Sequence, residues 1–165
     1  MRRLLAAAAA LAALAACASG ADRATTPSSD VTSTGTWAYA FDAGPGIASA
    51  TLSGADGRPA LRVTCTAPRG DLMVTDWLFS RARQGDAEAT VTVGAVSKSV
   101  PGRIAGDGAG RQALTFALPP RDPMFAAMTP SSSVKTSAAG YTHTWAPGAA
   151  TRLNDVINSC RTLGS

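Results

Sequence analysis

The chain has 165 residues, a length that suits one domain with a single hydrophobic core. Its 15 basic and 11 acidic side chains give a formal net charge of +4. The basic residues form no run with interleaved aromatic side chains, and we therefore expect no nucleic acid partner.

An apolar segment near the N-terminus predicts export. Arg2 and Arg3 precede an uncharged stretch of 13 residues, from Leu4 to Ala16. A bilayer-spanning helix needs about 20 apolar residues, whereas the apolar core of a secretory signal peptide has roughly 7–15. We therefore expect residues 1–16 to be a signal peptide. The alternative to the lipoprotein signal described next is an ordinary secretory signal that Cys17 follows by chance.

The run Leu14-Ala15-Ala16-Cys17 resembles the lipobox of bacterial lipoproteins. The resemblance implies that Cys17 is lipidated on its sulfur, becomes the N-terminus after cleavage and carries acyl chains such as palmitate. Ala18, in place of an aspartate, is similar to the pattern that directs lipoproteins to the outer membrane of Gram-negative cells. We therefore expect a bacterial cell-envelope protein, anchored by its N-terminal lipid at the periplasmic face of the outer membrane.

Composition divides the rest of the chain into a tether and a domain. Residues 17–35 are predicted to form the lipidated N-terminus and a flexible tether, and residues 36–165 a β domain. Ser, Thr, Gly and Ala dominate residues 18–35, where Val31 is the one apolar branched side chain. Such a segment buries too little apolar surface to offset the entropy of ordering. The tether would hold the domain roughly 20–25 Å from the membrane.

Short apolar or alternating runs, separated by Gly, Pro and Asp, fill most of the domain. Alternation of apolar and polar residues is typical of half-buried strands, and regularly spaced turn signals favour an antiparallel arrangement. The predicted fold is mainly β, as an antiparallel β-sandwich or a partly open barrel. The expected strands are 37–41, 47–52, 61–65, 72–79, 89–93, 99–104, 113–118, 134–138 and 141–145.

Two segments predict helices. Asp122 is a good N-cap and Pro123 suits the first helical position, which predicts a short helix of about two turns over 122–128. Residues 149–161 predict a C-terminal helix, because the four apolar residues of one helical stripe recur at the required spacing. Those four residues are Leu153, Val156, Ile157 and Cys160.

The cysteines predict one disulfide. If Cys17 carries lipid, Cys65 and Cys160 remain as a pair in an oxidising compartment. Cys65 shares the core face of its strand with Leu61 and Val63, and Cys160 lies on the apolar stripe of the C-terminal helix. We therefore expect a Cys65–Cys160 bond. Two cysteines without further ligands at close spacing predict no metal site.

Two motifs resemble catalytic patterns but have simpler interpretations. His143 is the only histidine, so we expect a packed or surface strand histidine rather than part of a catalytic triad or a multi-histidine metal site. The tetrad Ser132-Ser133-Val134-Lys135 matches the S-x-x-K pattern of penicillin-recognising acylases. That chemistry needs the serine and lysine one helical turn apart, whereas this tetrad enters a predicted strand.

Other polar and sulfur side chains also favour structural roles. Met124 and Met128 could together bind Cu(I), but methionines on a short helix more often fill a core. We expect the scattered acids to be solvated loop residues. These acids are Asp71, Asp76, Asp86 and Glu88.

Six aromatic residues are expected mainly in the core, with one or two available for a partner or glycan surface. They are Trp37, Tyr39, Phe41, Trp77, Tyr141 and Trp145.

Three segments together resemble the C-terminal half of small exported domains of unknown function from alphaproteobacteria, and they are also similar to the invasion-associated locus B type of periplasmic β domain. The first is residues 121–128, the second a strand ending near Trp145-Ala146-Pro147, and the third the closing Ser159-Cys160-Arg161. The resemblance covers residues 61–161 and implies a compact, disulfide-closed β domain. It supplies no catalytic residue.

These features predict a membrane-anchored envelope lipoprotein that is a non-catalytic binding or accessory module, with an envelope protein or polymer as its partner. We expect no enzymatic activity, no catalytic residues and no cofactor. One alternative is an inhibitor or protective factor against a hydrolase, acting through the loop over 68–71. The other is a cell-wall or glycan hydrolase, which would need paired acids in a deep pocket.

Overall fold

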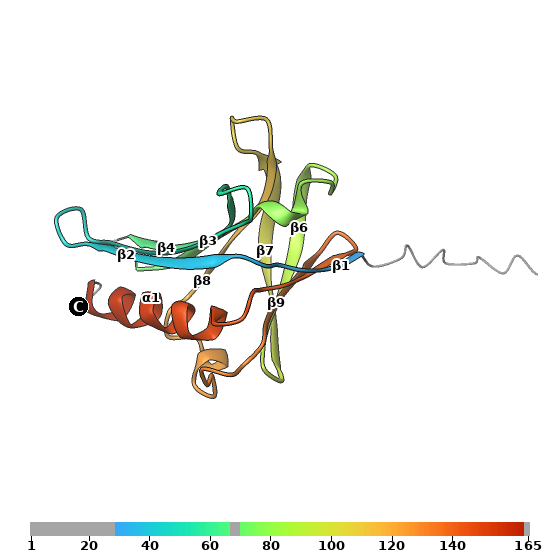
Figure 1. Cartoon of the computed structure of the whole chain (residues 1–165). Coiled ribbons are helices and arrows are strands. Elements are labelled where there is room, and N and C mark those ends of the chain that lie inside the picture. Colours follow the sequence, from blue (N-terminus) through green and yellow to red (C-terminus); the bar gives the residue numbers. More distant parts are fainter. Residues whose placement is uncertain (1–28, 67–69, 164–165) are drawn as a thin grey trace, which may run out of the picture.

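The computed structural model describes residues 29–66 and 70–163 (Figure 1). The predicted signal peptide, Cys17 and most of the predicted tether lie outside the described residues. Residues 68 and 69 of the loop proposed for an inhibitor (68–71) also lie outside them.

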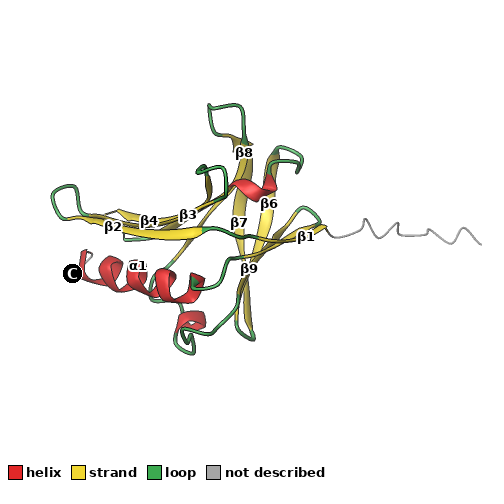
Figure 2. Ribbon diagram, in the orientation of Figure 1, coloured by secondary structure: helices red, strands yellow, loops and turns green. Residues whose placement is uncertain are grey.

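The described chain forms one curled, mixed sheet, a half-barrel with one C-terminal helix (Figure 2). The prediction of a mainly β, partly open barrel is therefore confirmed. The strands follow the order β1-β10-β9-β6-β7-β8-β5-β4-β3-β2. Their bounds are β1 Ser29–Thr32, β2 Thr36–Asp42, β3 Ile47–Ser53, β4 Pro59–Thr66, β5 Leu72–Asp76, β6 Gly85–Val93, β7 Val96–Gly106, β8 Gln112–Leu118, β9 Val134–Ala138 and β10 Tyr141–Thr144.

Alternation within the strands selects the core face. On β4, Leu61, Val63 and Cys65 are buried, while Arg62 between them is exposed. All neighbouring strands pair antiparallel except β1 and β10, which are parallel. One face of the curled sheet therefore collects the apolar side chains, as period-two patterning requires.

The predicted tether is too long, because Ser29–Thr32 forms strand β1 beside β10. Only three residues then lead to β2 at the opposite edge of the sheet, and Figure 1 shows β1 and β2 along one extended path. Ser33 N–H donates to the Thr144 carbonyl at 2.9 Å. A Cβ on Gly35 would lie 2.1 Å from the Ser53 carbonyl oxygen, so only glycine fits this connection. Composition suggested a tether, whereas edge pairing orders the segment.

Two short 3₁₀ helices replace regular structure that the sequence predicted. The strand expected over 72–79 ends at Asp76, whose carboxylate accepts the Leu78 N–H at 3.0 Å and starts η1 (Trp77–Phe79). The helix expected over 122–128 is only η2 (Pro123–Phe125). Its Asp122 cap is confirmed, since Asp122 Oδ1 accepts the Met124 N–H at 3.0 Å. So short a segment cannot recover the cost of helix nucleation.

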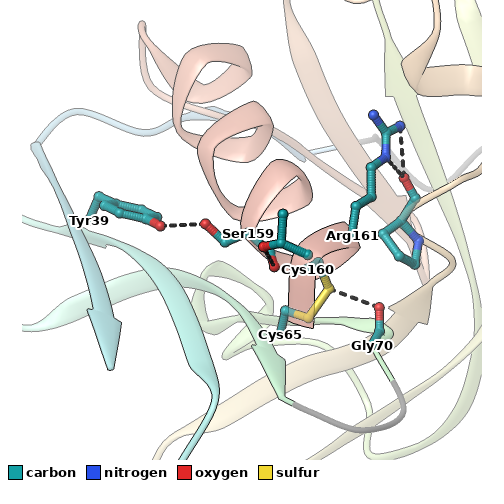
Figure 3. The surroundings of a disulfide bond; sticks show 8 residues. Tyr39, Cys65, Gly70, Ser159, Cys160 and Arg161 are labelled. Atoms are coloured by element: carbon teal, nitrogen blue, oxygen red, sulfur yellow. Dashed lines mark hydrogen bonds between the residues drawn. A yellow bond between two sulfur atoms is a disulfide. The ribbon is translucent and has the colours of Figure 1, made fainter. Parts of the chain in front are cut away.

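The C-terminal helix α1 (Ala149–Leu163) confirms the prediction and extends it by two residues. It packs against β2, β3, β4 and β5 through the buried side chains of the predicted stripe. The predicted disulfide is present and joins Cys160 to Cys65 of β4 (Figure 3). Beside it, the Tyr39 and Ser159 hydroxyl oxygens lie 2.7 Å apart in a hydrogen bond. The guanidinium of Arg161 donates to the Pro120 carbonyl at 3.1 and 3.2 Å.

Across residues 29–66 and 70–163, no helix is both long enough and apolar enough to cross a membrane.

Candidate binding groove and buried polar pair

Strands β7 and β8 separate partway along their length, and we call the gap between them the split. Their antiparallel ladder starts at the connecting turn and ends at the pair Gly102–Phe116. Beyond that pair, β7 continues beside β6 alone and β8 continues beside β5 alone. The sheet therefore opens between two strands that lie in its middle.

Two prolines explain why the ladder ends there. The Asp107 N–H donates to the Arg111 carbonyl across the turn at 2.8 Å. Because the hydrogen-bonded pairs of an antiparallel ladder recur at every second residue, this bond fixes which residues of β7 and β8 would pair. This register places Pro101 opposite Ala117 and Pro119 opposite Ser99. Proline has no N–H, so each pair lacks one of its two donors. The strands diverge where continued pairing would form the fewest main-chain hydrogen bonds.

The outer groove, as we name it, lies over the split on the exposed face of β5, β6, β7 and β8 and has a volume of about 810 Å³. Met73 on its wall is 44% exposed, and Ala117 is exposed as well. Val100 and Phe116 belong to the core, yet they also line the groove. Val100 and Phe116 are only 8% and 2% exposed, so they form an apolar floor of the groove while remaining buried.

The outer groove carries an excess of negative charge. Asp86 and Glu88 line it from β6, and Arg103 lines it from β7. Arg103 Nη1 lies 3.6 Å from Asp86 Oδ1, and both side chains are largely exposed, so this ion pair contributes little to stability. Within the described residues, no ion pair reaches Glu88. Its carboxylate is therefore available to a cation.

A second groove of about 450 Å³ lies beside η1, but its charged walls are already paired. Asp107 Oδ2 accepts from Trp77 Nε1 and from Arg111 Nε, both at 3.0 Å. Desolvation raises the pKa of Asp107, but these bonds and two backbone N–H groups outweigh it and lower the pKa. The Arg111 guanidinium also lies over the Trp77 ring and donates to the Pro59 carbonyl. This cluster fastens the β7–β8 turn to η1 and β4.

Asp76 and His143, which we call the buried pair, connect β5 to β10 across the interior of the curled sheet. His143 Nδ1 and Asp76 Oδ2 lie 2.6 Å apart, and the side chains are 2% and 0% exposed. Four strands separate β5 from β10 in the sheet, so this contact spans the interior. Burial raises the pKa of Asp76, although the hydrogen bond and charge of His143 and the Leu78 N–H act in the opposite direction.

The buried pair has the arrangement of a general base but gives no access to substrate. An ionised Asp76 accepts a proton-bearing Nδ1, which leaves the lone pair of a neutral ring on Nε2. His143 Nε2 is buried, and nothing in the described part of the chain forms a hydrogen bond with it. A triad needs a nucleophilic hydroxyl or thiol at that nitrogen. The pair therefore serves to hold the sheet in its curled shape.

The structure separates the acids and aromatics that the sequence singled out. The expectation of a solvated acid is wrong for Asp76, because η1 turns it inward as a cap, whereas the other three acids are exposed. His143 is a packed strand histidine, one of the two settings that were expected. Among the aromatics, Trp145 is buried and Phe41 is 50% exposed. The remaining aromatics are half-buried, namely Trp37, Tyr39, Trp77 and Tyr141.

The other candidates also lie in structural settings. Ser132 Oγ accepts the Thr129 N–H in a turn, and Lys135 is exposed on β9, so the tetrad enters a strand as expected. Met124 is buried in the core and Met128 packs against it. No group of three or more metal-ligating side chains is present in 29–66 and 70–163.

Sequence reasoning missed both the split and the buried pair. Pro101 inside a predicted strand was a usable signal, because proline within a strand marks an edge or an irregularity. Asp76 and His143 lie 67 residues apart, and no local pattern connects them. No family model matches this chain, and no curated protein or solved structure does so either.

Proposed function

We propose that this chain is a lipid-anchored, non-catalytic binding module of the bacterial cell envelope, and that its ligand occupies the outer groove. The observation that carries the proposal is the split, which combines an open groove, a floor of apolar side chains and a carboxylate without an ion pair among the described residues. Binding sites are typically concave and mainly apolar, with a few polar groups that orient the ligand. The outer groove is wide open to solvent, but its lining is mainly apolar and includes the Glu88 carboxylate, while the second groove has its charges paired internally.

The resemblance of residues 14–17 to a lipobox supports the anchoring part of the proposal. A Cys17→Ala variant should move from the membrane fraction to the soluble periplasmic fraction, because the acylated cysteine supplies the anchor. Retention of the variant in the membrane would contradict anchoring through Cys17.

The binding part is tested by photocrosslinking in living cells. A photoreactive amino acid at Met73, within the outer groove, should capture a discrete adduct. The matched control places the same group at Thr151, which is exposed on α1. Adducts of equal yield at both positions would contradict a specific groove, as would no adduct at Met73.

The alternative of a glycan hydrolase predicts turnover that depends on acids in a pocket. Asp86 and Glu88 are the carboxylates of the outer groove, and both are exposed. Release of soluble fragments from purified cell wall by the wild-type chain, and not by an Asp86→Asn/Glu88→Gln variant, would favour the hydrolase and contradict the proposal.

A further inference from the structure

The split leaves backbone groups of β7 without a strand partner. In the hairpin of β6 and β7, a two-residue turn makes Val93 and Val96 a hydrogen-bonded pair, so Lys98 and Val100 also bond to β6. The intervening residues, Ser97 and Ser99, direct their N–H and C=O groups away from β6. That direction faces the split, where the ladder with β8 is absent.

The pairing of β7 with β8 shows independently which backbone groups of β7 face the split. The hydrogen bond donated by Asp107 makes every second residue of β7 face β8, which again includes Ser97 and Ser99. Both residues are exposed, and their hydroxyls bond to β6 side chains at 2.8 and 3.0 Å rather than to these backbone groups. We name the backbone of Ser97 and Ser99 the open edge.

No strand of the described chain pairs with the open edge. β8 turns away at Pro119, which has no N–H to donate. Lys98 points to the opposite side and forms an ion pair with Asp122, the cap of η2. Burial raises the pKa of Asp122, but the bonds from Lys98 and from the Met124 N–H outweigh it and lower the pKa. This ion pair joins the cap of η2 to β7.

The side chains around the open edge indicate the partner's chemistry. Glu88 lies on β6 opposite Pro101, across β7 from the open edge, and its carboxylate forms no ion pair within the described chain. Met73 and Ala117 offer exposed apolar surface on the other side of the split. Alternate side chains of an extended segment lie on one face. A basic residue with an apolar residue two positions away would therefore complement both Glu88 and the apolar surface of Met73 and Ala117.

We propose that an extended, basic segment of another polypeptide binds by adding a short strand to the open edge of β7, with a cationic side chain at Glu88. Strand addition to an exposed edge supplies affinity through main-chain hydrogen bonds and specificity through alternate side chains. This inference rests on the proposed function, because it names the ligand class of the outer groove.

The test selects ligands without assuming their sequence. A displayed library of random heptapeptides is panned on the full-length chain in detergent micelles. The Kd of the best synthetic peptide is then measured for wild type, Ser99→Pro and Ser99→Ala. Ser99→Pro removes the N–H that faces the split, and Pro101 shows that β7 accepts proline at this parity. Ser99→Ala keeps that N–H and loses only the hydroxyl. Thermal unfolding of each variant checks that its fold is intact.

The expected result is a selected set enriched in Lys or Arg beside apolar residues. Ser99→Pro should weaken binding about tenfold or more and Ser99→Ala should leave it nearly unchanged, because only the first loses a main-chain bond. Glu88→Gln should weaken basic peptides about two- to fivefold. If Ser99→Pro fails to fold, N-methylation of alternate peptide residues tests the same bonds from the ligand side.

Other outcomes separate this inference from the proposed function. Peptides that lose affinity with a Met73→Ser variant, but bind Ser99→Pro as tightly as wild type, would overturn strand addition and keep the groove. Enrichment of acidic peptides would overturn the predicted charge. Selected peptides that are indifferent to both variants, or no enrichment at all, would overturn strand addition. If the crosslink at Met73 is also absent, the proposed function fails with it.

Discussion

The two sides of the split differ in what secures them. Strands β2–β5 pack under α1, and a disulfide joins that helix to β4. Strands β6, β7, β9 and β10 lie on the other side, beyond the packing of α1, and the buried pair joins β10 to β5 across the interior. Between them, β7 and β8 share a ladder only near their turn. A sheet secured covalently on one side and by a buried contact on the other can leave main-chain groups open in its middle.

The disulfide should contribute most to this arrangement. Replacing both Cys65 and Cys160 by alanine should lower the free energy of unfolding by about 4–5 kcal/mol, because the bond closes a loop of 95 residues in the unfolded chain. Urea unfolding of wild type and variant measures the difference. Wild type treated with reductant should match the variant, and unchanged stability in both would show that α1 holds the sheet by packing alone.

Breaking the buried pair, which secures β10 to β5, should lower the free energy of unfolding by a similar or smaller amount than removing the disulfide. His143→Leu leaves Asp76 buried without its partner and should cost about 3–5 kcal/mol at pH 7. The double variant Asp76→Asn/His143→Leu should recover much of that loss, since it removes the uncompensated charge. If the single and double variants lose the same free energy of unfolding, the pair contributes only through the packing of its side chains and not through its hydrogen bond and charge.

The buried pair also predicts a pH dependence. Burial raises the pKa of Asp76 above its ordinary 3.8, so the folded state binds this proton more tightly than the unfolded state. Its contribution to stability is therefore fully present below pH 3.8 and is lost as the pH rises through the folded pKa. The stability advantage of wild type over Asp76→Asn should shrink between pH 3 and pH 7. A constant or growing advantage, measured by urea unfolding, would contradict this direction.

The smallest expected effect lies at the last pair before the split. A Cβ on Gly102 would lie 3.2 Å from both the Thr115 carbonyl oxygen and Leu114 Cδ1, so Gly102→Ala should destabilise by about 1–2 kcal/mol. Gly106 on the same strand is the matched control, because its nearest atom would be 3.9 Å away. Gly106→Ala should be neutral or slightly stabilising. Equal effects would show that the junction is not tightly packed.

The sequence predicted features that repeat locally and missed those set by distant partners. Alternation on β4 and the stripe on α1 each fix a buried face, so the strands, the helix and the disulfide were predictable. Strand β1 was missed because its Ser- and Thr-rich residues are ordered only by pairing with β10. Asp76 was misjudged because a cap and a histidine 67 residues away turn it inward. The open edge follows from the register of three strands, which a single chain segment does not encode.

Amide hydrogen exchange of the free protein, resolved residue by residue by NMR, tests the open edge most directly. The N–H groups of Lys98 and Val100 bond to β6 and should exchange slowly, whereas those of Ser97 and Ser99 should exchange quickly. This alternation along one strand is the predicted result. Equal protection at all four residues would show that the split is closed and would contradict the proposed binding site.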